Sequence, residues 1–448
     1  MFTGFIRPVR RDVHSRSRTH LQASHLRRRS LVLALSLCLG VFAQPALADQ
    51  PLAFDQALQA AQDRSRQLVA QDAAVLASQQ MAVAAGQLPD PTLKVGINNL
   101  PVNGPDAYSL TRDFMTMRTI GIAQEFTRAD KRQARSEHYQ REAETAHASR
   151  ELILANLQRD TAMAWLDRYY QERMRDLLVT QHDEAGLQVA AADAAYRAGR
   201  GSQVDVFAAR SAVALIDDRI AQTDRQVATA KTQLARWIGE PATQPLGAPP
   251  AMETTRLDPS TLDTQLAHHP ELAVMAQQEQ MARADAAVAQ ANKKADWSVE
   301  LSYSQRGPSY SNMVSIGLSV PLQWDQKNRQ DREVAAKLAL VDEAHAQLEE
   351  ATREHTAEAR AMLQEWQSDR ERLARYESSL LPLAAQRTQA AVTAYRGNAG
   401  TLGAVLDARR GEIDTRMDRL RLEMDTARLW AQLNYLAPAD HVAAMAHP

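Results

Sequence analysis

Two methionines, Met115 and Met117, are the residues of this sequence whose type and spacing come nearest to a metal-binding pair. Thioether sulfur is a soft ligand that suits monovalent copper or silver. Methionine side chains also fill irregular apolar gaps, which is the alternative interpretation of the same pair. Met115 and Met117 are therefore candidate ligands, and no bound cofactor is expected.

The histidines and carboxylates form no recognisable catalytic motif. His268 and His269 precede Pro270, which favours a role at the start of a helix. The remaining histidines are scattered along predicted helices without the spacing of zinc ligands. A nucleophile elbow, a phosphate-binding loop and a pair of catalytic acids are also missing from the sequence. We therefore predict that the protein is not an enzyme.

A longer polar pattern occurs twice in the chain. A tyrosine, an arginine, a glycine, a hydroxyl residue and a second arginine recur at an offset of 199 residues. The first copy contains Tyr196, Arg197, Gly199, Gly201, Ser202 and Arg210, and the second contains Tyr395, Arg396, Gly397, Gly400, Thr401 and Arg409. Ile120-Gly121-Ile122 is echoed by Ile316-Gly317-Leu318 at an offset of 196. The two halves of the chain are therefore expected to share one fold.

Long helices must position these repeated segments. Residues 129–198 contain no proline and one glycine, which predicts a helix of about 105 Å. The return segment has apolar residues at heptad spacing, which is typical of helices that pack against other helices. Its first series is Val206, Val213, Ile220, Val227 and Leu234. The second half repeats the pattern over 329–395 and 401–434, so each half is predicted to carry a long helical hairpin.

Each hairpin is expected to reverse at its glycines, because glycine readily adopts the positive φ that a reversal between helices needs. The same turns leave backbone exposed for a partner, and the arginines beside them are candidate contacts, with ordinary solvated helix ends as the alternative. The tip residues are Tyr196, Arg197, Gly199, Gly201, Arg396, Gly397 and Gly400.

Strands with period two lie between the helices of each half. Leu93, Val95 and Ile97 alternate with polar or small residues, as do the residues of 119–123, 297–304 and 314–324. Strands of about ten residues with one apolar face and aromatic ends are typical of membrane β-barrels. A soluble antiparallel sheet with one buried face is the alternative.

Residues 1–48 have the features of a secretory signal peptide. Eight arginines precede the apolar run 31–42, and Ala46-Leu47-Ala48 follows it. The full chain has 52 basic and 54 acidic residues, and the leader holds eight arginines and one aspartate, so the mature chain has a formal charge of −9. A nucleic-acid partner is not expected. Cys38, the single cysteine, lies in the leader, so we expect no disulfides and no thiolate metal site.

Four membrane strands cannot close a barrel by themselves. A bilayer tolerates no open sheet edge, and single-chain barrels begin at about eight strands. Several chains are therefore expected to share one barrel, with eight strands in a dimer and twelve in a symmetric trimer.

The sequence resembles the TolC-type outer-membrane efflux proteins, and within them the heavy-metal branch of CusC-like and CzcC-like proteins. The resemblance covers essentially the whole mature chain, and the segment from Phe114 to Arg118 points to the metal branch. It rests on the repeat and on Leu88-Pro89-Asp90-Pro91, Asn99-Leu100-Pro101, Phe114-Met115-Thr116-Met117-Arg118, Gln124-Glu125-Phe126, His269-Pro270-Glu271-Leu272 and Leu433-Asn434-Tyr435-Leu436.

The resemblance implies a mainly α fold with a membrane β-barrel, in which four strands from each chain of a homotrimer form twelve strands in outer-membrane lipid. Coiled-coil hairpins would form a tunnel of twelve helices through the periplasm of a Gram-negative bacterium. Its partners would be a periplasmic adaptor and an inner-membrane pump of the resistance-nodulation-division (RND) class. The implied cargo is heavy-metal cations, either Cu and Ag or Co, Zn and Cd, with a duct for drugs or secreted proteins as the alternative.

The resemblance also implies a gate at the tips. Drug-exporting members carry a tyrosine before the second-half turn and two lumen-facing aspartates after it. Tyr395 matches the tyrosine and Asp407 the second aspartate, whereas Ala404 stands at the first. The first half offers Asp205 at the position equivalent to Ala404. Rings of these carboxylates would focus cations; favourable charge at helix starts is the alternative.

Two other protein classes would also explain long hairpins. A periplasmic adaptor would have a single hairpin, and a structural coiled coil would lack the strands.

The predicted organisation has five parts. The expected boundaries are a signal peptide at 1–48, a first repeat at 49–238 with a β-hairpin at about 91–126 and a helical hairpin at about 129–238, a linker at 239–259, a second repeat at 260–436 with a β-hairpin at about 297–324 and a helical hairpin at about 329–434, and a polar tail at 437–448.

Overall fold

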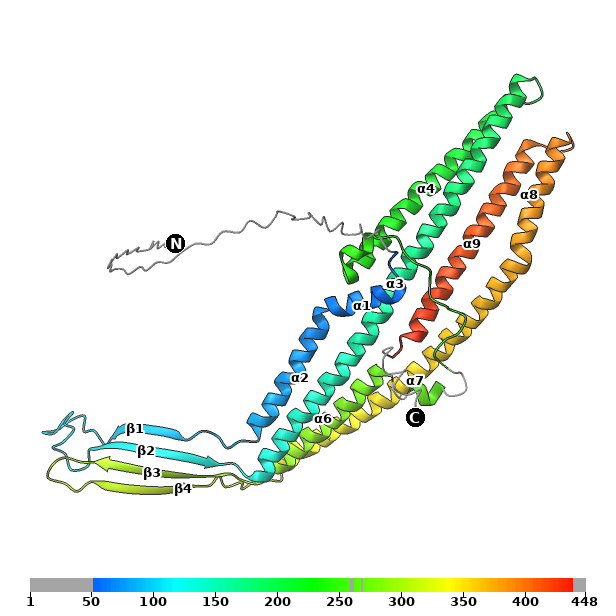
Figure 1. Ribbon diagram of the computed structural model, residues 1–448. Helices are drawn as coiled ribbons and strands as arrows, with labels where there is room; N and C mark the ends of the chain where they lie inside the picture. Colours follow the sequence, from blue (N-terminus) through cyan, green and yellow to red (C-terminus); the bar gives the residue numbers. More distant parts are fainter. Residues whose placement is uncertain (1–50, 258–261, 267–268, 438–448) are drawn as a thin grey trace, which may run out of the picture. The chain divides into compact units, whose positions relative to one another are not determined.

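The computed structural model describes residues 51–257, 262–266 and 269–437, which belong to one compact unit that begins at Asp49. The predicted signal peptide, Cys38, His268 and the tail from Pro438 lie outside the described residues. Within the unit, the strands lie at one end of the helices and the turns of two helical hairpins at the other (Figure 1).

Helices make up most of the unit. The first repeat contains α1 (Phe54–Arg64), α2 (Arg66–Ala85), α3 (Ala129–Arg197) and α4 (Gln203–Ile238). The linker contains the 3-10 turn η1 (Glu240–Thr243). The second repeat contains α5 (Leu262–Leu266), α6 (Pro270–Asn292), α7 (Gln330–Arg375), the π-helical segment η2 (Tyr376–Leu380), α8 (Leu381–Arg396) and α9 (Leu402–Asn434).

The long helix of the second repeat differs from its counterpart in the first. The 69 residues of α3 are continuous, whereas the stretch predicted as one helix over 329–395 is divided by η2. Pro382 explains the difference, because it has no N–H to donate and its ring excludes the carbonyl of Ser378 from the α-helical position. The backbone N–H of Leu381 instead bonds the carbonyl of Tyr376, five residues earlier.

The four strands form one antiparallel sheet in the order β1-β2-β3-β4. They are β1 (Thr92–Asn98), β2 (Met117–Phe126), β3 (Trp297–Gln305) and β4 (Met313–Ser319). The central pairing of β2 with β3 joins the hairpins of the two repeats, with Ile122 opposite Leu301. The predicted fold of helical hairpins with four strands is thus confirmed.

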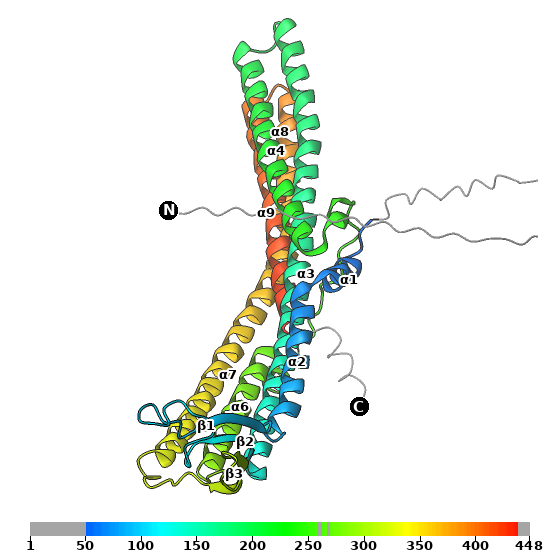
Figure 2. The same ribbon diagram turned by 90° about the vertical axis from the view of Figure 1, so that its left-hand side faces the viewer.

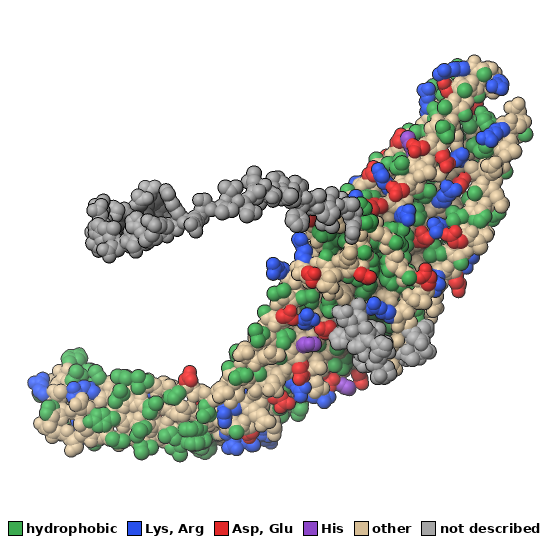
Figure 3. Space-filling view, viewed as in Figure 1, with side chains coloured by type: hydrophobic (Ala, Val, Ile, Leu, Met, Phe, Trp, Pro, Cys, Tyr) green, Lys and Arg blue, Asp and Glu red, His purple; other side chains and the backbone are tan. Residues whose placement is uncertain are grey.

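The register places apolar side chains on one face of the sheet. One row across all four strands consists of Leu93, Ile122, Leu301 and Ile316, and the next consists of Val95, Ile120, Tyr303 and Val314. All eight side chains are exposed in the single chain. Hydrophobic side chains cover much of the strand end in the space-filling view, whereas charged side chains gather over the helices (Figure 3).

The opposite face of the sheet is polar and closely packed. Lys94 of β1 and Glu300 of β3 form an ion pair across the intervening strand β2. Gly121 lies in β2 on this face, and a Cβ there would stand 2.8 Å from Cβ of Ser302. Glycine is therefore required at this position by the close approach of β3.

The main apolar core lies where helices of both repeats meet. Phe54 of α1 packs edge-on against Trp165 of α3, with ring centroids 5.5 Å apart, and contacts Trp430 of α9 at 6.1 Å. Leu166 and Leu234 are fully buried nearby. In the view turned by 90°, α3 and α9 run together through this region (Figure 2). The core therefore joins the two repeats.

The linker after α4 is fastened to this core. Arg168 of α3 is 1% exposed and donates to the carbonyls of Ala242, at 2.7 Å, and Gln244, at 2.8 Å. Further along the linker, the indole N–H of Trp430 donates to the carbonyl of Thr254 at 2.9 Å. The linker thus passes from the end of the first repeat to the last helix of the second.

No helix in the described part of the chain has both the length and the apolar character that crossing a membrane requires.

Candidate functional site

The turns of the two helical hairpins have the same backbone structure. In the first turn, the N–H of Gly199 bonds the carbonyl of Tyr196 at 3.0 Å, and the N–H of Arg200 bonds that of Ala195 at 2.9 Å. In the second turn, Asn398 and Ala399 make the corresponding bonds to residues 395 and 394 at 3.1 and 2.8 Å. Both are Schellman turns, which satisfy carbonyls left unpaired at a helix end.

The prediction that glycines supply the left-handed residue of each turn is right for the first turn and wrong for the second. Gly199 has a φ of 68°, and the matching residue is Asn398 with a φ of 57°, not Gly397. The predicted positive φ is wrong for Gly201, Gly397 and Gly400, because these residues are absent from the positive-φ glycines of the described chain. Asparagine tolerates the left-handed region, so the second turn needs no glycine there. The offset of 199 residues relates Gly199 to Asn398.

Gly201 and Gly400 are needed for a different reason, which is close packing. A Cβ on Gly201 would lie 3.2 Å from Cβ of Ala195, and one on Gly400 would lie 3.1 Å from Cβ of Ala394. Both glycines precede the residues that cap the following helix. The two turns thus bring the chain back against the last turn of the helix that it has just left.

Replacing Gly199 with alanine should open the first turn, because a residue with a Cβ costs about 1–2 kcal/mol in the left-handed conformation. Hydrogen–deuterium exchange at the Arg200 amide, whose bond to Ala195 closes the turn, would measure the effect. Gly397→Ala is the matched control, since Gly397 has a φ of −83° and needs no special conformation. Equal exchange in both variants would contradict the assignment.

The two candidate gate carboxylates lie in different surroundings. Asp205 forms a capping box with Ser202: its carboxylate accepts from the Ser202 hydroxyl at 2.7 Å and from the Ser202 N–H at 3.0 Å. These hydrogen bonds lower the pKa of Asp205. Asp407 is exposed, one turn into α9. Asp205 therefore has a role at the helix start, whereas the Asp407 side chain is open to solvent.

The other tip residues divide between packing and exposure. Tyr395 packs against a small apolar cluster that both hairpins build from Ala192, Val206, Ala209, Leu402 and Val405. Tyr196, Arg197 and Arg396 are exposed, and Arg197 forms an ion pair with Asp193 one turn earlier. The shared cluster holds the two turns together within one chain.

The candidate methionine ligands lie at the far end of the sheet. Met117 is the first residue of β2 and pairs with Asn98, and Met115 is exposed in the preceding loop. Between them, Thr116 is fully buried and its hydroxyl donates to the carbonyl of Asn99 at 3.0 Å. The loop is thus anchored at Thr116.

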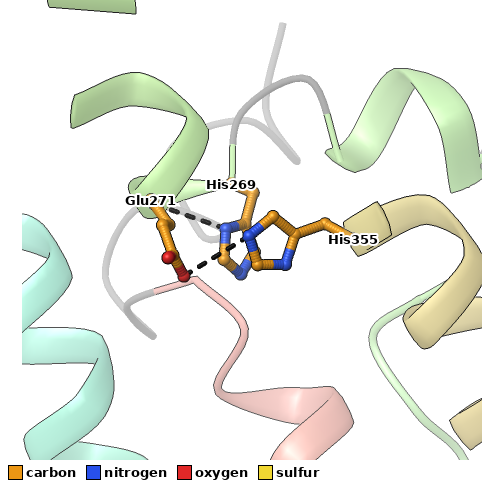
Figure 4. A group of neighbouring side chains, drawn as sticks. All are labelled: His269, Glu271 and His355. Atoms are coloured by element: carbon orange, nitrogen blue, oxygen red, sulfur yellow. Dashed lines mark hydrogen bonds and ion pairs between the residues drawn. The ribbon is translucent and has the colours of Figure 1, made fainter. Parts of the chain in front are cut away.

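A histidine cluster appears that the sequence did not predict. His269 acts at the start of α6, as expected, because its Nδ1 accepts from the N–H of Glu271 at 3.3 Å. His355 of α7 stacks on His269, with ring centroids 4.8 Å apart, and its Nε2 lies 3.4 Å from a Glu271 oxygen (Figure 4). Because 86 residues separate the two histidines, no local spacing could reveal the group.

Part of the sequence matches a known protein family. Residues 57–240 match the family described as outer membrane efflux protein. No curated protein matches the sequence. The two hairpins, α3–α4 and α7–α9, also differ from the single hairpin that the adaptor alternative requires.

Solved outer-membrane channels share the fold over most of their length. The outer membrane protein VceC from Vibrio cholerae is 18% identical, with a TM-score of 0.71 over 86% of this chain and 95% of VceC. CusC is 14% identical, with a TM-score of 0.71 over 86% of this chain and 92% of CusC. The Campylobacter jejuni CmeC outer membrane channel is 10% identical, with a TM-score of 0.72 over 88% of each chain.

Both comparisons find outer-membrane proteins. The fold that the register and the paired turns define is common to these channels, and the sequence match covers most of the first repeat. The described unit therefore has the fold of solved outer-membrane channels, and residues 57–240 are similar to the outer membrane efflux protein family.

Proposed function

We propose that the chain is one subunit of a homotrimeric outer-membrane duct in a Gram-negative bacterium. The observation that carries this proposal is the four-stranded sheet, in which β1 and β4 each pair with one strand of the described chain. One face carries exposed apolar rows, and open edges are not tolerated in a bilayer. Three copies, joined β4 to β1, would close a barrel of twelve strands in outer-membrane lipid.

The helical hairpins would continue the duct through the periplasm. The proposed partners are a periplasmic adaptor and an inner-membrane RND pump, and the adaptor would dock at the two Schellman turns. Exposed Tyr196, Arg197 and Arg396 support this assignment, as do the turn glycines Gly199, Gly201, Gly397 and Gly400. Arginine is frequent at protein interfaces, and glycine leaves the backbone accessible to a partner.

The throat of the proposed duct lies near the same turns. Three copies of Asp407 would form an exposed ring of negative charge, which concentrates cations in a narrow passage. Asp205 contributes charge as well, but its carboxylate also caps α4. Tyr395 packs on the apolar cluster between the hairpins and would set the position of α8 beside this ring.

The proposed cargo is heavy-metal cations, either Cu and Ag or Co, Zn and Cd. Three observations support a cationic cargo: the resemblance of the segment from Phe114 to Arg118 to the metal branch, the acidic balance of the mature chain, and the exposed Asp407. Met115, exposed near the far end of the sheet, could offer a soft ligand along the path. A duct for drugs or secreted proteins is the competing cargo class.

Deletion of the gene in a strain that retains the cognate pump is expected to lower tolerance to at least one of these metals by several-fold. The physical reason is that the duct is the exit route, so cations accumulate in the periplasm when it is missing. Growth in graded metal salts measures the effect, with lipophilic drugs and detergents tested in parallel. Unchanged metal tolerance with raised drug sensitivity would reject the metal cargo and support the competing class.

A further inference from the structure

The histidine cluster at the start of α6 brings three potential ligands together from two helices. One ring nitrogen of His269, one of His355 and one carboxylate oxygen of Glu271 all lie within 4.8 Å of one another. Figure 4 shows the two rings side by side with the Glu271 carboxylate beside them. Among the residues that the structure describes, this is the group of histidines and acids whose ligand atoms lie close enough together to share a cation after a small rearrangement.

The surroundings of His269 favour its uncharged imidazole. His269 is 8% exposed, and its burial, together with His355 and Arg159, lowers the pKa of His269 to about 4. The Arg159 guanidinium is paired with Asp160 of the same helix at 2.9 Å. Neutral imidazole is the form that ligates metals.

A further carboxylate supports His355 from its other side. Nδ1 of His355 lies 3.5 Å from a carboxylate oxygen of Glu358, while Nε2 faces Glu271. Metal-bound histidines commonly donate their second ring N–H to a carboxylate, which orients the ring and raises its basicity. Glu358 occupies the position that such a supporting group needs.

Other histidines in the described chain lack this convergence. His345, also on α7, lies between two carboxylates, but Glu279 faces its Nδ1 and Glu349 its Nε2. The two acids face different ring nitrogens of His345. Among the described residues, no second histidine lies close enough to either acid to form a group that could hold a cation. His345 therefore provides an internal control for ordinary histidine–acid pairing.

We propose that His269, Glu271 and His355 bind a divalent transition cation of the Zn²⁺ or Co²⁺ class, which ties the start of α6 to α7. Two imidazoles and a carboxylate are borderline-to-hard ligands, and this set suits Zn²⁺ better than monovalent copper or silver. Glu271 is about half exposed, with 51% of its side chain accessible, which leaves a path for the cation and for a water ligand.

Binding requires a small rearrangement. With Zn–N bonds of 2.0–2.1 Å, ligand atoms around a tetrahedral zinc are roughly 3.3 Å apart. The ligand atoms here span at most 4.8 Å, so rotation of the accessible Glu271 side chain and small shifts of the two rings would complete the site.

The test uses the full chain, purified in detergent and freed of metal, with Zn²⁺ alone as the titrant and calorimetry as the readout. We expect His355→Ala to lose the site, and Glu358→Gln to weaken it by about 10–100-fold. His269→Asn removes the imidazole but keeps a side chain that can cap α6. Glu271→Gln changes one ligand without changing its shape, so it tests the site even where a histidine variant folds poorly.

His345→Ala is the matched control and should bind Zn²⁺ like the wild type. Visible absorption of the Co²⁺ form gives a second readout, because ligand loss changes the coordination that produces the spectrum. Zn²⁺ affinity that is unchanged in His355→Ala, His269→Asn and Glu271→Gln would overturn the proposal, as would no binding by the wild type with Zn²⁺ in excess. Because binding is measured on the isolated protein, the result is independent of the proposed duct and its cargo.

Discussion

Ile316→Arg is expected to prevent stable assembly of the duct in the outer membrane. Ile316 lies at the centre of β4, is 78% exposed in the single chain, and belongs to the apolar row that crosses all four strands. If this face meets lipid, an arginine near the bilayer midplane costs about 2–4 kcal/mol in each chain. The penalty occurs once per subunit, so about three times that amount opposes a trimer. Membrane fractionation and the mass of the detergent-extracted protein measure the loss.

Ser315→Arg is the matched control, because Ser315 precedes Ile316 on the same strand and points to the polar face. A water-filled lumen should accept the added charge, so this variant should extract as a trimer like the wild type. Loss of assembly in Ser315→Arg alone would assign the faces the other way round. Normal assembly of both variants, or a wild type that is a stable monomer or dimer, would contradict the shared barrel.

Local periodicity was sufficient to predict most of the secondary structure. Strand alternation such as Leu93, Val95 and Ile97 follows directly from the side-chain period of two, and the helices follow from composition and heptad spacing. Pro382 is a local signal of the same kind, because a proline within a helical pattern predicts a break or kink there, although the proline alone does not specify the π-helical form that the structure has at Tyr376–Leu380.

The tips show where a repeat in the sequence can mislead. The glycines of both turns were expected to supply the positive φ, whereas in these turns the left-handed residues are Gly199 and Asn398, which stands 199 positions later. Conformation, rather than residue type, is what the two turns have in common. The constant offset of 199 residues, which also relates Gly201 to Gly400, was the better guide.

Contacts between distant segments could not be predicted from periodicity. The pairing of β2 with β3 joins residues such as Ile122 and Leu301 that are far apart in the chain, and the stacking of His269 on His355 depends on how α6 packs against α7. A helix pattern says which face is apolar, but not which residues of another helix meet it. The buried Arg168 is a further example, since arginine on a helix is ordinarily exposed.

Arg168 is a buried polar anchor of the linker. Its Nε donates to Glu172 at 2.9 Å, and its two terminal nitrogens donate to the linker carbonyls of Ala242 and Gln244. The same part of the linker also binds the segment before α1, because the N–H of Leu52 bonds the carbonyl of Pro245 at 2.8 Å. Loss of the arginine would therefore loosen both the linker and the segment that leads into α1.

Arg168→Ala is expected to destabilise the fold, by about 1–3 kcal/mol for each buried carbonyl that loses its donor, whereas Glu172 keeps Lys231 as an ion-pair partner. The midpoint of urea unfolding of the detergent-solubilised protein measures this loss, and proteolysis within residues 239–257 should rise at the same time. Arg175→Ala is the matched control on α3, since Arg175 pairs with Asp224 at the surface and such pairs contribute about 0–1 kcal/mol. Similar midpoints for both variants would show that the linker is held mainly by its apolar contacts. A selective loss in Arg168→Ala would place the anchor at this one guanidinium, which joins α3 to the linker.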